Sequence, residues 1–148
     1  MDYLSEALAL ERQGDYAAAL TSYRLALRDQ PNDHRVLQNM AIAYSRTGQL
    51  DLAVRCYRRA LEAEPKLSGA HYGLAYLLLK RDEREDAARH LEAFLAAPPQ
   101  SAEAERWVRH ARVTLSQLRG EAPMDTDSAE QPPDRVLDQP EAPDNYDS

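Results

Sequence analysis

The feature that most constrains this chain is a sequence pattern that recurs every 34 residues. The segment GDYAAALTSYRLALRDQP runs from Gly14 to Pro31, and GQLDLAVRCYRRALEAEP runs from Gly48 to Pro65. Both have glycine, alanine, tyrosine, arginine, alanine, leucine and proline at matching spacings, and Pro99 lies another 34 residues along. A fixed period of this length predicts an array of small repeated units rather than one ordinary domain.

Each repeat predicts two amphipathic helices joined by a tight turn. The first helix of each repeat is expected at residues 2–13, 33–46 and 68–81, and the second at residues 15–28, 50–63 and 83–97. The recurring prolines end the second helices, because proline cannot continue the hydrogen-bond ladder of a helix. Asn32 or Asp33, Ser68 and Ser101 follow these prolines and are expected to cap the next helix.

The turn inside each repeat is predicted from a residue that must adopt a left-handed conformation. Gly14 and Gly48 occupy this position in the first two repeats, and glycine adopts a positive φ at no steric cost. The third repeat has Asp82 instead. A looser or reshaped turn is therefore expected in the third repeat.

Small and large apolar residues also recur with the period of the repeat. The small ones are expected where two helices approach closely, at Ala7, Ala41 and Ala75 on the first helices and at Ala19, Ala53 and Ala87 on the second. The large ones are expected to fill the core beside them, namely Leu37, Met40, Tyr44, Tyr57, Leu61, Leu74, Leu78, Leu91 and Phe94. One hairpin of this size cannot offset its own loss of conformational entropy, so the units must stack.

The rest of the chain divides into two segments of different composition. Residues 101–119 carry an apolar stripe on an otherwise charged helix and predict a capping helix. Residues 120–148, which we call the acidic tail, contain nine acidic residues, one arginine and five prolines, a composition that predicts disorder. The tail has a net charge of −8, whereas residues 1–119, with 17 basic and 16 acidic residues, have +1.

Charge and motif content exclude several classes of function. A nearly neutral body lacks the clustered positive face that nucleic-acid binding needs. No apolar segment approaches the ~20 residues of a membrane helix, and the N-terminal sequence does not resemble a signal peptide, so a soluble cytoplasmic protein is expected. The single cysteine and the spacing of the histidines predict no metal site. Without a phosphate loop or a catalytic motif, we predict no cofactor and no enzymatic activity.

The repeated residues resemble the tetratricopeptide repeat (TPR) family, most fully in the second repeat. The matching residues there are Leu37, Met40, Ala41, Tyr44, Gly48, Ala53, Tyr57, Ala60 and Pro65. The first repeat departs from the family pattern at Glu6, and the third departs at Asp82 and Phe94.

This resemblance implies an all-α fold, a right-handed α-solenoid of three TPR helix-turn-helix units with a C-terminal capping helix and a disordered acidic tail. The implied boundaries are residues 1–33, 34–67 and 68–100 for the repeats, 101–119 for the capping helix and 120–148 for the tail.

In the TPR family, the non-core face of the first helices lines a concave groove that binds peptides. Carried over position by position, the resemblance implies a peptide-binding groove formed by Leu8, Arg12, Arg35, Gln38, Asn39, Ile42, Arg46, Tyr72, Tyr76, Arg106, Trp107 and His110. Exposed aromatic residues and arginines are typical of the contacts that dominate binding energy. The alternative is that Trp107 and the tyrosines pack against one another or under the acidic tail. The carboxylate clamp of some family members is not expected, because only Asn39 matches it.

Three functions remain open at this point. The leading hypothesis is an adaptor or scaffold that binds a peptide or helical segment of another protein in the groove. The second is a small-client chaperone of the kind found in bacterial secretion systems. The third is self-association, in which the segment DRVLDQP, from Asp134 to Pro140, acts as an internal ligand of its own or a neighbouring chain. The expected partner is thus a protein, and neither nucleic acid nor a membrane.

Overall fold

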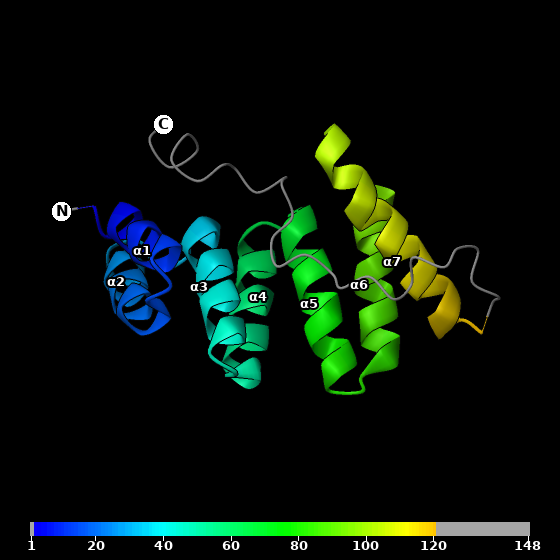
Figure 1. Ribbon diagram of the computed structural model, residues 1–148, viewed down its shortest axis with the longest axis horizontal. Coiled ribbons are helices and arrows are strands. Elements are labelled where there is room, and N and C mark those ends of the chain that lie inside the picture. The colour runs from blue at the N-terminus through cyan, green and yellow to red at the C-terminus, as the bar shows by residue number, and fades with distance from the viewer. Residues whose placement is uncertain (1, 121–148) are drawn as a thin grey trace. The chain divides into compact units, whose positions relative to one another are not determined.

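The computed structural model describes residues 2–120, which form seven α-helices and one 3₁₀ turn and contain no strand (Figure 1). The helices are α1 (Tyr3–Arg12), α2 (Tyr16–Asp29), α3 (His34–Arg46), α4 (Leu50–Ala63), α5 (Ser68–Lys80), α6 (Arg84–Ala96) and α7 (Glu105–Leu118), and the 3₁₀ turn is Ala102–Ala104. The all-α class is confirmed, and the acidic tail beyond Gly120 lies outside the described residues. Within residues 2–120, no helix combines the length and apolar character needed to cross a membrane.

The described helices group into two compact units, the first containing α1–α4 and the second α5–α7. In the first unit α1 packs on α2 and α3 packs on α4, and the two hairpins meet through α2 and α3. In the second unit α5 packs on α6, and α7 packs against this hairpin, mainly through α6 and also through side chains of α5. Helical hairpins are therefore the building block of both units, and the two helices of each lie side by side (Figure 1).

The helices of each hairpin approach closely because small residues lie between them. The alanines expected at these contacts have no exposed surface: Ala7, Ala19, Ala41, Ala53, Ala75 and Ala87. Large side chains fill the adjacent space, and Leu37, Leu74 and Leu78 are likewise fully buried. Each large apolar side chain contributes roughly 1.5–3 kcal/mol when it is buried.

Replacing Ala53 with leucine tests this close contact. Ala53 has no exposed surface, so Ala53→Leu must push α3 and α4 apart and is expected to lower the free energy of unfolding by ~1–3 kcal/mol. Urea denaturation followed by circular dichroism measures this. The matched control is Ala17→Leu, because Ala17 is exposed on α2. Equal stability of the two variants would show that the helices have room for a larger side chain.

The turn between the helices of a hairpin has the same backbone geometry in all three repeats. Gly14 and Gly48 have φ values of 81° and 80°, and Asp82 has φ 60° at the equivalent position. Each donates its N–H to the carbonyl three residues earlier, and the next residue donates to a carbonyl five residues before it, at 2.9–3.2 Å. The expectation of a reshaped third turn is therefore wrong. Asp82 adopts the left-handed conformation although it is not glycine.

Substitutions at these turns should change stability in opposite directions. A Cβ on Gly48 would meet no atom within 4 Å, so Gly48→Ala tests the backbone alone and should cost about 1–2 kcal/mol through its positive φ. Asp82→Gly relieves the same cost and should raise the melting temperature. Thermal unfolding followed by circular dichroism measures both variants. A fall in melting temperature for Asp82→Gly would indicate that the aspartate side chain stabilises the turn.

Side-chain caps begin several of the helices, as the sequence predicts. Asp33 caps α3 by accepting a hydrogen bond from the Arg35 N–H at 3.0 Å, and Ser101 caps the 3₁₀ turn by accepting from Ala104 N at 3.2 Å. The prediction for Ser68 is wrong. Ser68 is the first residue of α5, Leu67 is at the cap position, and the Ser68 hydroxyl donates to the Ala97 carbonyl at 3.1 Å.

Two glutamates of α1 make polar contacts with α2. Ser22 Oγ donates to Glu6 Oε1 at 2.8 Å, and the fully buried Tyr23 donates its hydroxyl to Glu11 Oε1 at 2.5 Å. Glu6, the departure from the family pattern in the first repeat, is thus satisfied by a serine of the facing helix. Hydrogen bonds to charged groups are among the stronger ones in proteins.

The second unit has its own core, in which α7 packs against the α5–α6 hairpin. Phe94 of α6, the larger residue that departs from the family pattern, is fully buried between Leu91 and Tyr72 in this core. Its ring lies 5.0 Å from the Tyr72 ring, centroid to centroid. Ala111 and Leu115 of α7 complete the cluster. The apolar stripe of residues 101–119 is therefore the surface by which α7 packs.

Candidate functional site

Four of the predicted groove residues form a stripe along α3. Arg35, Asn39, Ile42 and Arg46 recur at intervals of three or four residues, so they lie on one side of the helix. The distance from the first arginine to the last is about 16 Å, from the rise of 1.5 Å per residue. We call this set the α3 stripe. It has a cation at each end and an amide and an aliphatic side chain between them.

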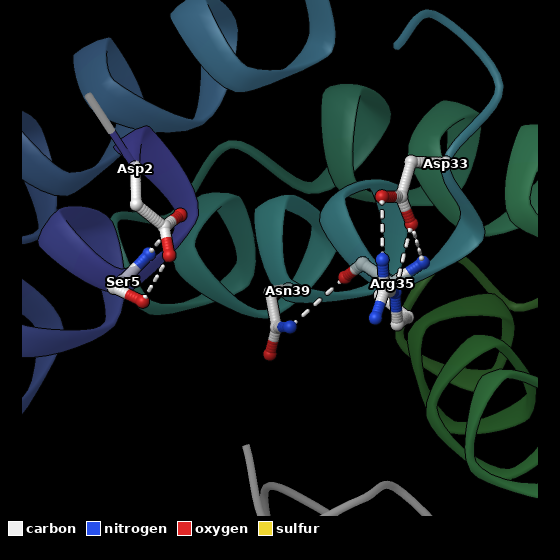
Figure 2. A network of polar contacts seen from close by, with 5 residues as sticks. All are labelled: Asp2, Ser5, Asp33, Arg35 and Asn39. Carbon is white, nitrogen blue, oxygen red and sulfur yellow. Dashed lines mark hydrogen bonds and ion pairs between the residues drawn. The ribbon is translucent and has the colours of Figure 1, made fainter. Parts of the chain in front are cut away.

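Asp33 fixes the first arginine of the stripe. Its Oδ1 accepts from the backbone N–H of Arg35 at 3.0 Å and from Nε of the guanidinium at 3.2 Å, and its Oδ2 accepts from Nη2 at 3.2 Å (Figure 2). One carboxylate therefore caps α3 and orients an arginine side chain. The Arg35 side chain keeps 27% of its surface exposed, so it can still contact a ligand.

The two residues in the middle of the stripe, Asn39 and Ile42, are buried. Asn39 is fully buried, and its Nδ2 donates to the carbonyl oxygen of Arg35 at 2.9 Å (Figure 2). Gln38, which precedes Asn39 on α3 and lies outside the stripe, is also buried. The middle of the stripe is thus recessed, and the two arginines at its ends are the more accessible side chains.

Arg46 ends the stripe at the carboxyl end of α3. Its guanidinium carbon lies 5.6 Å from the centroid of the Tyr16 ring, within the range of a cation–π contact. Arg12, the corresponding basic residue in the last turn of α1, is exposed, whereas Leu8 of α1 is buried. The first unit therefore offers exposed arginines above a recessed polar and aliphatic surface.

In the second unit, the predicted aromatic residues contact one another. The Tyr76 ring lies 4.9 Å from Tyr72 and 5.2 Å from His110, centroid to centroid. The Tyr76 hydroxyl is 3.0 Å from Thr114 Oγ1 of α7. Trp107 belongs to the core of this unit. The alternative foreseen for these residues, mutual packing, accounts for most of their surface.

Burial raises the pKa of Tyr76 to about 12. The phenol is therefore neutral at physiological pH and acts as a hydrogen-bonding group. With Thr114 as its neighbour, it links α5 to α7. Tyr76 is half-buried, so part of its side chain remains accessible to solvent.

The twelve predicted residues differ in their accessibility. Six are buried, namely Leu8, Gln38, Asn39, Ile42, Tyr72 and Trp107. Three are half-buried, Arg35, Tyr76 and His110, and three are exposed, Arg12, Arg46 and Arg106. Seven belong to the first unit and five to the second. Whether they bind a ligand remains a prediction.

Two polar pairs of the second unit were not foreseen. His71 and His90, on α5 and α6, place their Nδ1 atoms 2.9 Å apart. His71 is half-buried, and its histidine partner lies 19 residues away in the chain. Thr114 was likewise not singled out, because 38 residues separate it from Tyr76. Only the pairing of helices brings these residues together.

Cys56 is a buried, unreactive thiol. Only 6% of its surface is exposed, and burial raises its pKa from 9.0 to about 11. The thiolate is the reactive form of cysteine, so this environment disfavours both alkylation and oxidation.

Alkylation of Cys56 should accordingly be slow in the native protein. Because burial raises the pKa of Cys56 from 9.0 to about 11, the thiolate fraction at pH 8 is roughly a hundredfold lower than in the unfolded chain. Iodoacetamide labelling followed by mass spectrometry, with and without 8 M urea as the control, measures the two rates. The alkylation rate of the native protein should keep rising with pH above pH 9, because the thiol is still mostly protonated there. Native and unfolded rates within fivefold of each other at pH 8 would show that Cys56 is accessible.

The structure is that of a helical-repeat protein. Its three helical hairpins have the same turn geometry and the same alanine contacts between their helices. The family model described as "Psidin, N-terminal TPR repeats region" matches residues 4–91, which is more than half of the 148-residue chain. The chain belongs to this family of tetratricopeptide repeat proteins.

Two curated proteins are similar to parts of the chain. The TPR repeat-containing thioredoxin TTL4 of Arabidopsis thaliana is 36% identical over 80 residues, which is 54% of this chain and 12% of that protein. Tetratricopeptide repeat protein 21A of Mus musculus is 35% identical over 85 residues, 57% of this chain and 6% of that protein. The chain therefore spans only a small part of each relative.

Solved structures share the fold over most of the chain. The Yersinia enterocolitica type III secretion chaperone SycD, in complex with a peptide of the translocator YopD, has a TM-score of 0.73 at 19% identity, covering 79% of this chain and 89% of SycD. MamA from Desulfovibrio magneticus RS-1 has a TM-score of 0.68 at 26% identity, covering 79% of this chain and 64% of that one. These similarities confirm the helical-repeat fold.

Proposed function

We propose that the chain is a non-enzymatic adaptor that binds a peptide segment of another protein, with the α3 stripe as its main contact. The observation that supports this most directly is the fixed pair of arginines at the two ends of the stripe. Asp33 holds Arg35 through its guanidinium, and Tyr16 lies beneath Arg46. Arginines that are already oriented lose less conformational entropy when a ligand binds.

The chemistry of the stripe suggests what such a segment contains. Arg35 and Arg46 match carboxylates, which arginine binds in a bidentate manner. Asn39 and Ile42 between them are buried, so the two arginines are the accessible contacts of the stripe. A length of about 16 Å accommodates roughly five extended residues at 3.3 Å each, so the proposed ligand is a short segment with acidic residues near its two ends.

The second unit supplies a separate candidate contact region. Arg106 is exposed on α7, and Tyr76 and His110 are half-buried beside one another. Aromatic and arginine side chains are common at energetically dominant positions of interfaces. Replacing these side chains with alanine is a poor first test of binding, however, because the Tyr76 hydroxyl also links α5 to Thr114 of α7.

Arg46→Ala is the sharper test of the adaptor function. Affinity purification with the wild-type chain and mass spectrometry first identify the partner. Arg46→Ala should then weaken binding of that partner by about 1–2 kcal/mol, roughly 5–30-fold, with little change in melting temperature. Arg55→Ala on α4, also an exposed arginine, is the matched control. Equal affinities of both variants and the wild type would contradict a role for the α3 stripe.

A second candidate is a chaperone for a small client protein. The similarity to SycD, whose structure contains a peptide of the translocator YopD, favours this candidate over a permanent scaffold. The two functions differ in the state of the bound partner. Amide hydrogen exchange of the bound partner distinguishes the two functions. The backbone amides of an unfolded chaperone client should exchange rapidly, whereas those of a folded scaffold partner should be protected.

A further inference from the structure

A cavity of about 540 Å³ lies between α6 and α7, on a different side of α7 from Trp107 and His110. Its apolar lining is Leu95 of α6 together with Val113 and Leu115 of α7, and its polar lining includes Arg109, Arg112 and Arg119. By helical periodicity, the side of α7 that bears Arg109 and Arg112 faces away from His110 and Thr114, which face Tyr76. The cavity is therefore distinct from the aromatic contacts between α5 and α7, and of the predicted binding residues only Arg106, three residues before Arg109, lies on its side of the helix.

Helix α7 differs from the first helices of the repeats in the neighbour on which it packs. Among the described residues, α1, α3 and α5 each pack on the helix that follows them in the chain, and α7 packs on the preceding helix α6. The cavity on this part of α7 has an apolar floor and arginines at its rim.

The charge of the cavity limits what can cover it. Residues 105–119 contain four arginines and one glutamate, a net charge of +3. Arg119 at the rim forms an ion pair with Glu92 of α6, and Arg109, Arg112 and Arg119 are all exposed to solvent. A second copy of the chain packed symmetrically through the same surface would place arginines against arginines. An acidic occupant with apolar side chains is the complementary one.

We propose that Asp134–Asp138 of the same chain, with the sequence DRVLD, docks in this cavity. Val136 and Leu137 would contact the apolar floor, and the flanking aspartates would meet Arg109 and Arg112. These two apolar residues are adjacent, and the segment DRVLD has a net charge of −1, because Arg135 offsets one of its two aspartates, within a tail of net charge −8. Docking therefore requires Arg135 to point away from the arginine rim, toward solvent or the acidic residues of the tail.

The connection to α7 makes this contact favourable. The described residues end at Gly120, next to the cavity-lining Arg119. The 14 residues from Gly120 to Asp134 have a root-mean-square length of roughly 20 Å as a flexible chain. Helix α7 is itself about 21 Å long, so the tether reaches any point of the cavity. A tethered segment of this kind acts at millimolar effective concentration.

The test uses the full chain labelled with ¹⁵N and compares its amide signals with those of a synthetic peptide of residues 130–142. In the wild type, the Val136 and Leu137 signals should differ from their positions in the free peptide. Arg112→Glu should move them to the free-peptide positions. Arg55→Glu, which reverses an exposed arginine on α4, should leave them unchanged. Wild-type signals at the free-peptide positions would overturn the proposal, and signals that shift with protein concentration would show docking onto a second copy instead.

A competition experiment tests the same contact without altering the cavity. The full chain with Val136→Asp and Leu137→Asp should bind the labelled peptide about tenfold more tightly than the wild type, because its own tail no longer competes. Met124→Asp is the matched control in the tail and should behave as the wild type. The peptide should shift the amide signals of Leu95 and Val113. Equal affinities of the variant and wild type, or shifts confined to α3, would refute docking in this cavity.

Discussion

The close approach of paired helices at alanine is the contact on which the rest of the structure depends. Ala7, Ala41 and Ala75 lie on the first helices of the hairpins, and each is fully buried. A larger side chain at these positions would separate the helices and open voids beside the large residues of the core, because protein interiors are closely packed. The recurrence of alanine every 34 residues is therefore a steric requirement, and positions without this requirement differ between repeats.

This packing determines which side chains are available for recognition. The hairpin contacts use the side of α3 that contains Leu37, Ala41 and Tyr44, which are all buried. The remaining side has Arg35 and Arg46, whose positions are set by local neighbours rather than by the core. Polar side chains that are fixed in this way give a binding surface a defined geometry, because they do not have to be ordered again by each ligand.

The sequence predicted the bounds of the six repeat helices to within one residue, because proline, glycine and apolar spacing act locally. It also placed the residues of the candidate site on the correct helices. It did not predict that Asn39 and Ile42 are buried, or that Tyr76 pairs with Thr114, because these depend on the packing of helices distant in the chain. The error at Asp82 has another cause: its backbone follows the turn that the neighbouring helices impose.

The hydrogen bond from Ser68 to the Ala97 carbonyl has a consequence for local motion. The last turn of a helix ordinarily frays before the rest of the helix opens, since its terminal carbonyls have no partner within the helix. Here the hydroxyl of Ser68, the first residue of α5, donates a hydrogen bond to the carbonyl that follows the last turn of α6. This bond links the start of α5 to the end of α6. Exchange of the Ala97 amide, which itself bonds to Phe94, therefore reports the separation of α5 from α6 rather than simple unwinding of one helix end.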